Sequence, residues 1–163
     1  MSRIVCNTGP LIALGLLARL DILKSLFSEV LVPEAVQREI ELGGVNQMGL
    51  ASFRQADWIR VATLQGGRDT LLESLLDAGE AAVISLAREQ GMATVLIDER
   101  KARKVARDIH GLQVIGTVRI LVEAKRRGLL AEIASSFKKL RQEGYWIHDS
   151  IVQVALREAG EAV

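Results

Sequence analysis

The sequence predicts a single α/β domain with a central parallel sheet of four to five strands, flanked by helices and completed by a helical C-terminal cap. Three observations lead to this prediction. The chain has 163 residues, 49% of them hydrophobic, which is enough for one buried core and too few for two ordinary domains. Short β-branched runs alternate with longer segments of helical period, as in βαβ units. After residue 115 only helical segments follow, so we take residues 1–163 as one domain.

The expected strands are short apolar runs bounded by polar or glycine residues. They span residues 3–6, 30–32, 58–61, 94–97 and 113–115. Helices are expected to begin near Pro10, Asp21, Pro33, Gly49, Asp69, Gly79 and Glu99. Three further helices, at residues 118–127, 130–143 and 148–159, form the predicted cap.

Composition excludes several classes of protein. The formal net charge is +1, which is not the strongly basic balance of many non-specific nucleic-acid binders. Cys6 is the only cysteine, so neither an intramolecular disulfide nor a multi-thiolate zinc site can form. The apolar N-terminus resembles a signal peptide, but the polar run from Asn7 to Pro10 interrupts it, and no stretch reaches the roughly 20 apolar residues of a membrane span. We therefore expect a cytoplasmic protein.

Glu39 is the first acidic residue in an unexpected place. A helical wheel of the segment after Pro33 places Ala35, Val36, Ile40 and Leu42 on one apolar face, with Glu39 in its middle. A carboxylate on a core-facing stripe costs several kcal/mol unless it is paired. Glu39 therefore indicates either a bound cation or an internal ion pair with an arginine.

Glu80 also points inward, because it shares a helical face with Val83, Ile84 and Ala87. An alternative explanation is local. Asp77 and Glu80 have the spacing of a capping box, and an acid in the first turn of a helix is favoured by the helix dipole.

Two polar residues follow predicted strands directly. Asp98 comes after the strand at residues 94–97, and Asn7 comes after the first strand. Ligands bind outside the carboxyl ends of strands in open α/β sheets, although both residues are also good helix caps. Capping does not explain why these two groups coexist with two inward-facing glutamates. The glycine-rich phosphate loops of nucleotide-binding proteins do not occur in this sequence.

Several separated motifs resemble the PIN-domain family, in its order and over nearly the whole chain. The segment from Cys6 to Ile12 is similar to the opening D-T-S-x-L-I motif of that family. It is followed by the inward helix glutamate, by Gly79-Glu80-Ala81 and by Leu96-Ile97-Asp98-Glu99-Arg100. The residues in these motifs are most similar to a VapC-like branch of the family, which also has a later Gly-Thr pair and an Ala-Lys-Arg-Arg-Gly helix.

The resemblance implies a Mg²⁺- or Mn²⁺-dependent endoribonuclease that hydrolyses RNA phosphodiester bonds, often as the toxin of a toxin-antitoxin pair. It also implies a small antitoxin partner and a homodimer or higher homo-oligomer. Glu39, Glu80 and Asp98 match the family's catalytic acids, and Glu99 adds a further carboxylate. Thr8, Arg100, Arg103 and Thr117 are expected to contact RNA, with helix capping as the alternative for Thr117.

Asn7 departs from the family pattern, because it stands where the family has an aspartate. It supplies a carbonyl oxygen without charge, so the site carries about three negative charges if the other acids ionise. We therefore expect one tightly held metal ion. The alternative function is a catalytically weak PIN scaffold that binds nucleic acid or protein.

The basic residues of the helix after Asp98 form a stripe. Arg100, Arg103, Lys104 and Arg107 are expected on the face opposite Ala102, Val105, Ala106 and Ile109. Such a stripe is typical both of a solvated helix face and of a phosphate-binding surface. Tyr145 and Trp146 are expected to pack the last helix against the body, with a wall of the substrate site as the alternative. His110 and His148 are expected to be loop or capping residues.

Overall fold

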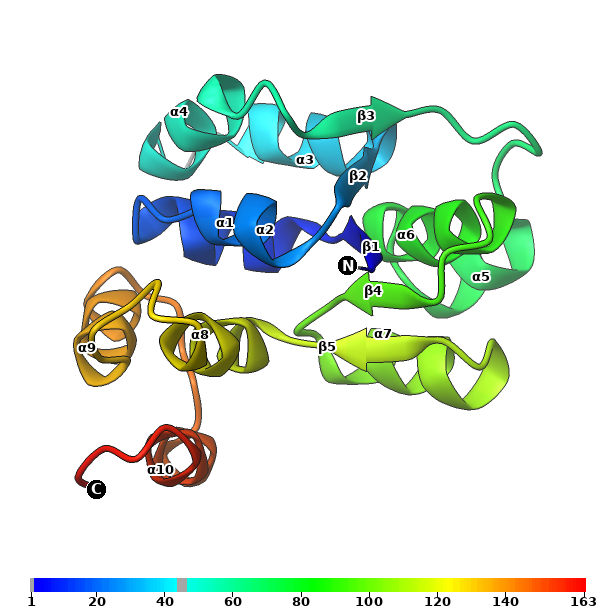
Figure 1. Ribbon diagram of the computed structural model, residues 1–163. Helices are drawn as coiled ribbons and strands as arrows, with labels where there is room; N and C mark the ends of the chain where they lie inside the picture. Colours follow the sequence, from blue (N-terminus) through cyan, green and yellow to red (C-terminus); the bar gives the residue numbers. More distant parts are fainter. Residues whose placement is uncertain (1, 44–46) are drawn as a thin grey trace.

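The computed structural model describes residues 2–43 and 47–163, and it has the predicted α/β architecture (Figure 1). In these residues, five parallel strands form one sheet in the order β3-β2-β1-β4-β5. The strands are β1 (Arg3–Cys6), β2 (Glu29–Pro33), β3 (Arg60–Ala62), β4 (Thr94–Leu96) and β5 (Gln113–Ile115). The predicted parallel sheet is thus confirmed, and β3 alone is displaced by more than one residue at its start.

Helices connect the strands and close the C-terminal end, as predicted. The first group is α1 (Thr8–Leu16), α2 (Asp21–Leu26), α3 (Glu34–Gly43), α4 (Gln47–Gln55), α5 (Thr70–Leu75) and α6 (Ala78–Glu89). The second is α7 (Arg100–Lys104), which continues as the π-helical turn η1 (Val105–Ile109), then α8 (Thr117–Arg126), α9 (Ala134–Gln142) and α10 (Asp149–Glu158). In Figure 1, α1, α2 and α8 lie to one side of the strands, and α5 and α6 to the other. No helix of the described residues is both long enough and apolar enough to cross a bilayer.

The core lies along the central strands, whose apolar runs are covered on both faces. Ile4 and Val5 of β1, Leu31 of β2, and Val95 and Leu96 of β4 are fully buried. The edge strands β3 and β5 are only partly buried. Continuous apolar runs in the central strands are what a two-sided parallel sheet requires.

The order of strands reverses between β1 and β4, since β2 and β3 extend the sheet on one side and β5 on the other. Cys6 pairs with Leu96, and the backbone N–H of Asn7 donates to the carbonyl of Leu96 at 3.0 Å. The predicted adjacency of these strand ends is confirmed. A crevice at such a reversal is the usual ligand site of open α/β sheets.

Two residues predicted to face the core are exposed. Leu42 is 83% exposed, because it sits near the end of α3 and about 120° around the helix from Val36. Ile109 is 63% exposed, because η1 is a π-helix and its wider turn rotates side chains away from the positions that an α-helical wheel assigns.

The start of α9 also differs from the prediction, since it begins at Ala134 rather than at residue 130. Glu161 accepts hydrogen bonds from the backbone N–H groups of Ile133 and Ala134 and pairs with Lys125 at 2.9 Å. A carboxylate from the end of the chain therefore satisfies the first turn of α9. Glu161 is 28 residues from Ile133 and 27 residues from Ala134 in the sequence. A local capping pattern therefore could not predict this contact.

Candidate functional site

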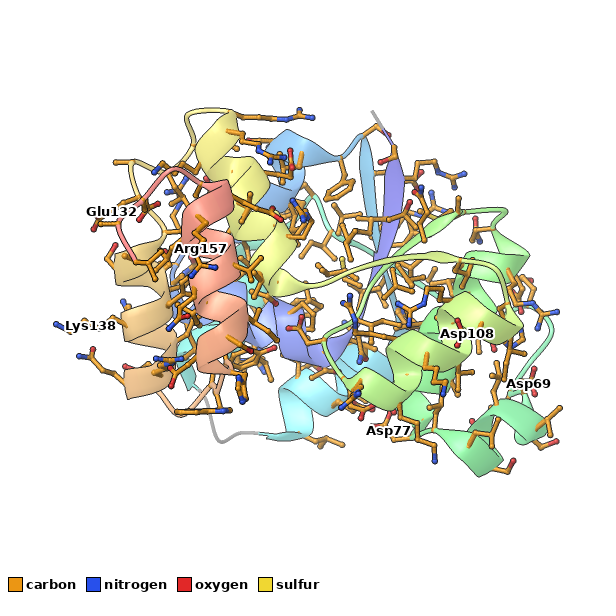
Figure 2. All side chains as sticks on the ribbon, turned by 90° about the horizontal axis from the view of Figure 1, so that it is seen from below. Asp69, Asp77, Asp108, Glu132, Lys138 and Arg157 are labelled. Atoms are coloured by element: carbon orange, nitrogen blue, oxygen red, sulfur yellow. The ribbon has the colours of Figure 1, made fainter. Side chains whose placement is uncertain are left out.

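A cavity of about 360 Å³ opens at the strand reversal and brings together every acidic or amide residue predicted for the site. Its lining comes from the ends of β1 and β4, from α3, from the start of α6 and from the segment before α10. The lining residues are Asn7, Thr8, Gly9, Pro10, Glu39, Asp77, Glu80, Asp98, Glu99 and Tyr145. Figure 2 shows Asp77, at the start of α6, on the side of the molecule away from Glu132, Lys138 and Arg157 of the C-terminal cap.

Asn7 lies at the end of β1 with a side chain that is only 6% exposed. It occupies the N-cap position of α1, yet its side chain makes no capping hydrogen bond. Among the described residues, no donor reaches its buried Oδ1 atom. Leaving a buried acceptor unsatisfied costs about 1–3 kcal/mol. The geometry thus does not support the capping interpretation, and it leaves an oxygen available in the cavity.

Glu39 reaches the cavity from α3, and Thr8 Oγ1 donates a hydrogen bond of 2.6 Å to its Oε2 atom. No arginine forms an ion pair with Glu39 in the part of the chain that the structure describes, so the salt-bridge interpretation finds no support. Helix α6 approaches closely because residue 79 is glycine. A Cβ atom there would lie 2.2 Å from Glu39 Oε1.

Glu80 is 8% exposed and completes the predicted capping box. Its backbone N–H donates to Asp77 Oδ1 at 2.8 Å, and its Oε1 accepts from the backbone N–H of Asp77 at 3.2 Å. Burial raises the pKa of Glu80 to about 7, and the carboxylates of Asp77, Glu99 and Glu39 act in the same direction against the backbone hydrogen bond. Glu80 is therefore both a cap and a perturbed acid of the cavity.

Asp98 follows β4 and is held by the beginning of α8. The backbone N–H of Thr117 donates to Oδ1 at 2.7 Å, and Thr117 Oγ1 donates to Oδ2 at 2.5 Å. Tyr145 donates a second hydrogen bond to Oδ2. The carboxylate comes this near to α8 because residue 116 is glycine, whose Cβ would lie 2.7 Å from Oδ1.

Tyr145 packs against the core as expected, and it also lines the cavity, as the alternative interpretation allowed. Its hydroxyl reaches Asp98 from a position 47 residues later in the chain, a contact that the sequence analysis did not predict. Burial, with the nearby Asp98 carboxylate, raises the pKa of Tyr145, so the hydroxyl stays protonated and serves as a donor. Trp146 is 71% exposed and does not pack inward as expected.

The remaining predicted residues divide into cavity-facing and surface groups. Glu99 lines the cavity and caps α7 by accepting from the backbone N–H of Ala102 at 2.8 Å. Arg100 is exposed at the start of α7. Arg103 is half-buried, and its Nη1 donates to the carbonyl of Ile97 at 2.7 Å. Thr117 is only 1% exposed. Its side chain holds Asp98 in position and is not accessible on the surface for contact with RNA.

The histidines lie where the sequence analysis expected them. His148 is the N-cap of α10 and accepts from the backbone N–H of Ser150 at 3.2 Å. His110 follows η1 in a turn, and burial lowers its pKa. Neither lines the cavity.

Oxygen ligands from carboxylates and an amide suit hard divalent cations such as Mg²⁺ and Mn²⁺. Within residues 2–43 and 47–163, no three His, Cys, Asp or Glu side chains are grouped so that they could hold a metal ion. Glu39, Glu80, Asp98 and Glu99 each accept a hydrogen bond from a protein donor. A cation in this cavity would have to draw the carboxylates together and replace some of these hydrogen bonds. Asn7 Oδ1 has no hydrogen bond to lose among the described residues.

A family model described as PIN domain covers residues 3–161, which is nearly the entire chain. No curated protein shows significant similarity to the sequence.

Proposed function

The chain belongs to the PIN-domain family, whose members are generally nucleases that use divalent metals, and from this premise we propose that it is a metal-dependent endoribonuclease acting on RNA. Glu39, Glu80 and Asp98 are the proposed catalytic acids. Mg²⁺ or Mn²⁺ is the proposed cofactor.

The observation that carries this proposal is the unsatisfied Oδ1 atom of Asn7. It is buried in a cavity whose other polar lining is mostly acidic. An anion bound beside Glu39, Glu80 and Asp98 could not satisfy this buried acceptor. A cation, or a water molecule bound to a cation, could do so. The donor set therefore fits a hard divalent ion.

In the proposed site, the oxygens of Asn7, Glu39, Glu80 and Asp98 hold the ion directly or through water, and Glu99 contributes at the rim. The ion would supply Lewis acidity, lowering the pKa of water and stabilising charge on the phosphate. The protein orients the ligands: Thr8 fixes Oε2 of Glu39, and Thr117 fixes both oxygens of Asp98.

Helix α7 supplies the proposed approach for RNA. It begins at the cavity directly after Glu99, and Arg100 and Lys104 are exposed along it. Cations on an exposed helix next to an acidic site attract phosphates flanking the scissile bond without neutralising the acids themselves. Arg103 is tied to the carbonyl of Ile97, so Arg100 is the stronger candidate of the two predicted arginines.

The finer biological role follows from the resemblance to VapC-like proteins. We propose a toxin that acts with a small antitoxin protein and forms a homodimer. A short reading frame encoding a helical protein next to the gene would support this role. Co-expression of that protein should then suppress RNA cleavage.

A cleavage assay tests the proposed activity. The parent should cut single-stranded RNA in Mn²⁺ or Mg²⁺ and lose activity in a chelator. Asp98→Asn should reduce cleavage by at least 100-fold, on the scale of losing one essential electrostatic group. Asp108→Asn is the matched control, because Asp108 lies on the surface in an ion pair with Arg107. Cleavage that persists in the chelator, or in Asp98→Asn, would refute the proposed metal-dependent activity.

A second candidate function is a weakly catalytic scaffold that binds RNA or protein. It is favoured by the amide at position 7, which removes one negative charge from the family's usual set. An RNA-binding assay separates the two functions. Tight RNA binding by the parent, with no cleavage in any divalent metal, would identify the scaffold.

A further inference from the structure

A second and larger cavity, of about 620 Å³, shares Asp98 with the acidic cavity. It lies between the edge strand β5 and helices α8 and α10. Its apolar lining includes Val114 and Ile115 of β5, Val118 and Val122 of α8, and Ile151 and Val154 of α10. Cavities of this size are typical binding sites for small organic ligands and cofactors. Glu39 and Glu80 do not line it, so the second cavity is a separate space beside the proposed catalytic acids.

Helix α10 presents apolar side chains to the second cavity. Ile151 and Val154 line it and are 49% and 52% exposed, and their spacing of three residues places them on one face of the helix. Arg119 of α8 forms an ion pair of 2.9 Å with Glu158 of α10, and both residues also line the cavity. Because this ion pair joins two of the elements that form the walls, the apolar space is already formed in the protein alone.

Arg103 is a half-buried cation where the two cavities meet. It lines the second cavity, and a Cβ atom at Gly116 would lie 2.8 Å from its Nη1 atom and 2.7 Å from Asp98 Oδ1. Nη1 donates to the carbonyl of Ile97 at 2.7 Å, and no carboxylate of the described residues forms an ion pair with the guanidinium. A guanidinium has five N–H donors, so most of them remain available to an anion.

The lining of the second cavity matches the parts of a nucleotide. Arg103 offers donors for phosphate oxygens, and the aliphatic side chains of α8 and α10 offer a surface for the face of a base. Proteins that recognise single-stranded RNA bind unpaired bases that are turned out of the strand. An apolar protein segment would cover the walls but leave the guanidinium unpaired. Since Asp98 lines both cavities, a strand whose scissile phosphate lies at the acids would bring the adjacent nucleotide to the second cavity.

We propose that the second cavity binds one unpaired nucleotide of RNA, with its base against the apolar side chains of α8 and α10 and a phosphate on Arg103. This inference rests on the proposed ribonuclease function and adds to it a subsite next to the scissile bond. Arg103 contacts the substrate inside the cavity, whereas Arg100 remains the proposed contact on the surface. The subsite favours single-stranded RNA, because a base that is paired and stacked in a duplex cannot enter it.

The experiment measures binding of a labelled single-stranded oligoribonucleotide to the full chain by fluorescence anisotropy, in a chelator so that no metal-dependent cleavage occurs. A second oligonucleotide has the same length and backbone but carries no bases. The parent should bind this abasic strand at least about tenfold more weakly, within the usual range for one base contact.

The double variant Ile151→Ala, Val154→Ala tests the apolar walls. Its affinity for the strand with bases should fall about tenfold, the scale of roughly two buried methylene groups, and its affinity for the abasic strand should not change. The double variant Leu71→Ala, Leu75→Ala is the matched control, because both leucines are exposed on α5 and do not line the cavity. Its affinity for both strands should equal that of the parent.

Arg103→Gln tests the phosphate contact. It should weaken binding of both strands by a similar factor and lower the slope of log affinity against log salt concentration by about 0.7, the value for one phosphate of a single strand. Arg68→Gln is the control, because Arg68 is exposed and paired with Glu73. Its salt slope should equal that of the parent.

Equal affinity of the parent for the two strands, an unchanged affinity in the double variant of α10, or an unchanged salt slope in Arg103→Gln overturns the nucleotide subsite. If the parent nevertheless cleaves RNA with Mn²⁺, the proposed function stands without the subsite. If the double variant of α10 loses affinity for the proposed antitoxin protein and not for RNA, the cavity is a protein-docking groove and the inference is also overturned. Binding that depends on the bases, on the walls and on Arg103, without cleavage in any divalent metal, supports the subsite and refutes the nuclease function.

Discussion

Asn7 is the residue whose environment in the cavity is most unusual. Its buried Oδ1 has no donor among the described residues, and it stands at the end of β1 within an acidic lining. An amide there lowers the repulsion between the surrounding carboxylates when no metal is bound. The same amide also weakens the attraction for a divalent cation. If the cavity binds a metal ion as proposed, position 7 thus affects the stability of the metal-free protein and the metal affinity in opposite directions.

The Asn7→Asp variant should separate these two effects. We expect the metal-free variant to be less stable than the parent by about 1–3 kcal/mol at neutral pH, because a further acid is buried among acids. Binding of Mn²⁺ should tighten, and a tenfold gain would add about 1.4 kcal/mol of stabilisation at saturating metal. RNA cleavage should equal or exceed that of the parent. Thermal melts with and without Mn²⁺ measure the first two effects.

Asp98→Asn is the comparison for this variant. If Asn7→Asp leaves the Mn²⁺ stabilisation unchanged while Asp98→Asn abolishes it, Asn7 does not contact the ion. The cation would then be held by the glutamates and Asp98.

Glu80 should give the metal-free protein a pH-dependent stability. Its folded-state pKa is about 7 against an ordinary value of 4.5, so the folded protein binds this proton more tightly than the unfolded chain does. The stabilisation is complete below about pH 4.5 and is lost as the pH rises through 7. Glu80→Gln should therefore match the parent near pH 4.5 and exceed its free energy of unfolding by about 1–3 kcal/mol at pH 8, after allowing for solvent screening.

Urea unfolding in a chelator from pH 4.5 to 8 measures this difference. A difference between parent and Glu80→Gln that does not change with pH would show that Glu80 titrates normally in the folded protein.

Among the helices, α3 and α6 are the pair whose approach shapes the cavity. Their contact brings Glu39 beside the first turn of α6, and it depends on the missing side chain of Gly79. The atoms that a Cβ would meet belong to the mobile end of the glutamate side chain and not to the backbone. Substitution there should move a ligand more than it disturbs the fold.

Gly79→Ala should thus displace the Glu39 carboxylate while leaving the free energy of unfolding within about 1 kcal/mol of the parent, because alanine favours the helix and offsets part of the crowding. The stabilisation by Mn²⁺ should fall sharply. Gly43→Ala is the control, since a Cβ at residue 43 meets no atom within 4 Å. Thermal melts with and without Mn²⁺ test both variants, and full Mn²⁺ stabilisation of Gly79→Ala would contradict the placement of Glu39 as a ligand.

In the protein as a whole, the contacts that stabilise the core are separate from the residues that line the cavity. Helices α1 and α4 pack with their backbones in near contact, and a Cβ at Gly15 would lie 2.9 Å from the Cα atom of Gly49. A backbone atom cannot rotate away as a side chain does. The contact lies away from the residues that line the cavity, so it affects the stability of the fold without changing the ligands.

Gly15→Ala should lower the free energy of unfolding by about 1–3 kcal/mol, the usual cost of overpacking. Gly49→Ala should be neutral or stabilising by up to about 1 kcal/mol, because its Cβ would meet only ordinary contacts of 3.6 Å and beyond. Both folded variants should retain the stabilisation by Mn²⁺. Urea unfolding and Mn²⁺-dependent melts measure these effects, and equal stability of the two variants would refute the close α1–α4 packing.

Local patterns were sufficient for most of the fold and for the acids of the cavity. Strand β5 begins and ends at the predicted residues, and the parallel sheet follows from the alternation of strands and helices. Glu39 and Asp98 were detectable because each is unusual within its own element, one on an apolar helix face and the other at the end of a buried strand. The hydrophobic period of an element, and the position of a residue within it, can both be read from a few neighbouring residues.

Tyr145 required the folded chain. Nothing in its own segment is unusual, and its hydroxyl meets Asp98 only because the C-terminal helices return to the sheet across 47 residues of sequence. The same holds for Glu161, which completes the first turn of α9. Periodicity reports which side of an element is buried, because neighbours within a turn share that side. It does not report which distant side chain fills the space there, because that depends on how the elements pack.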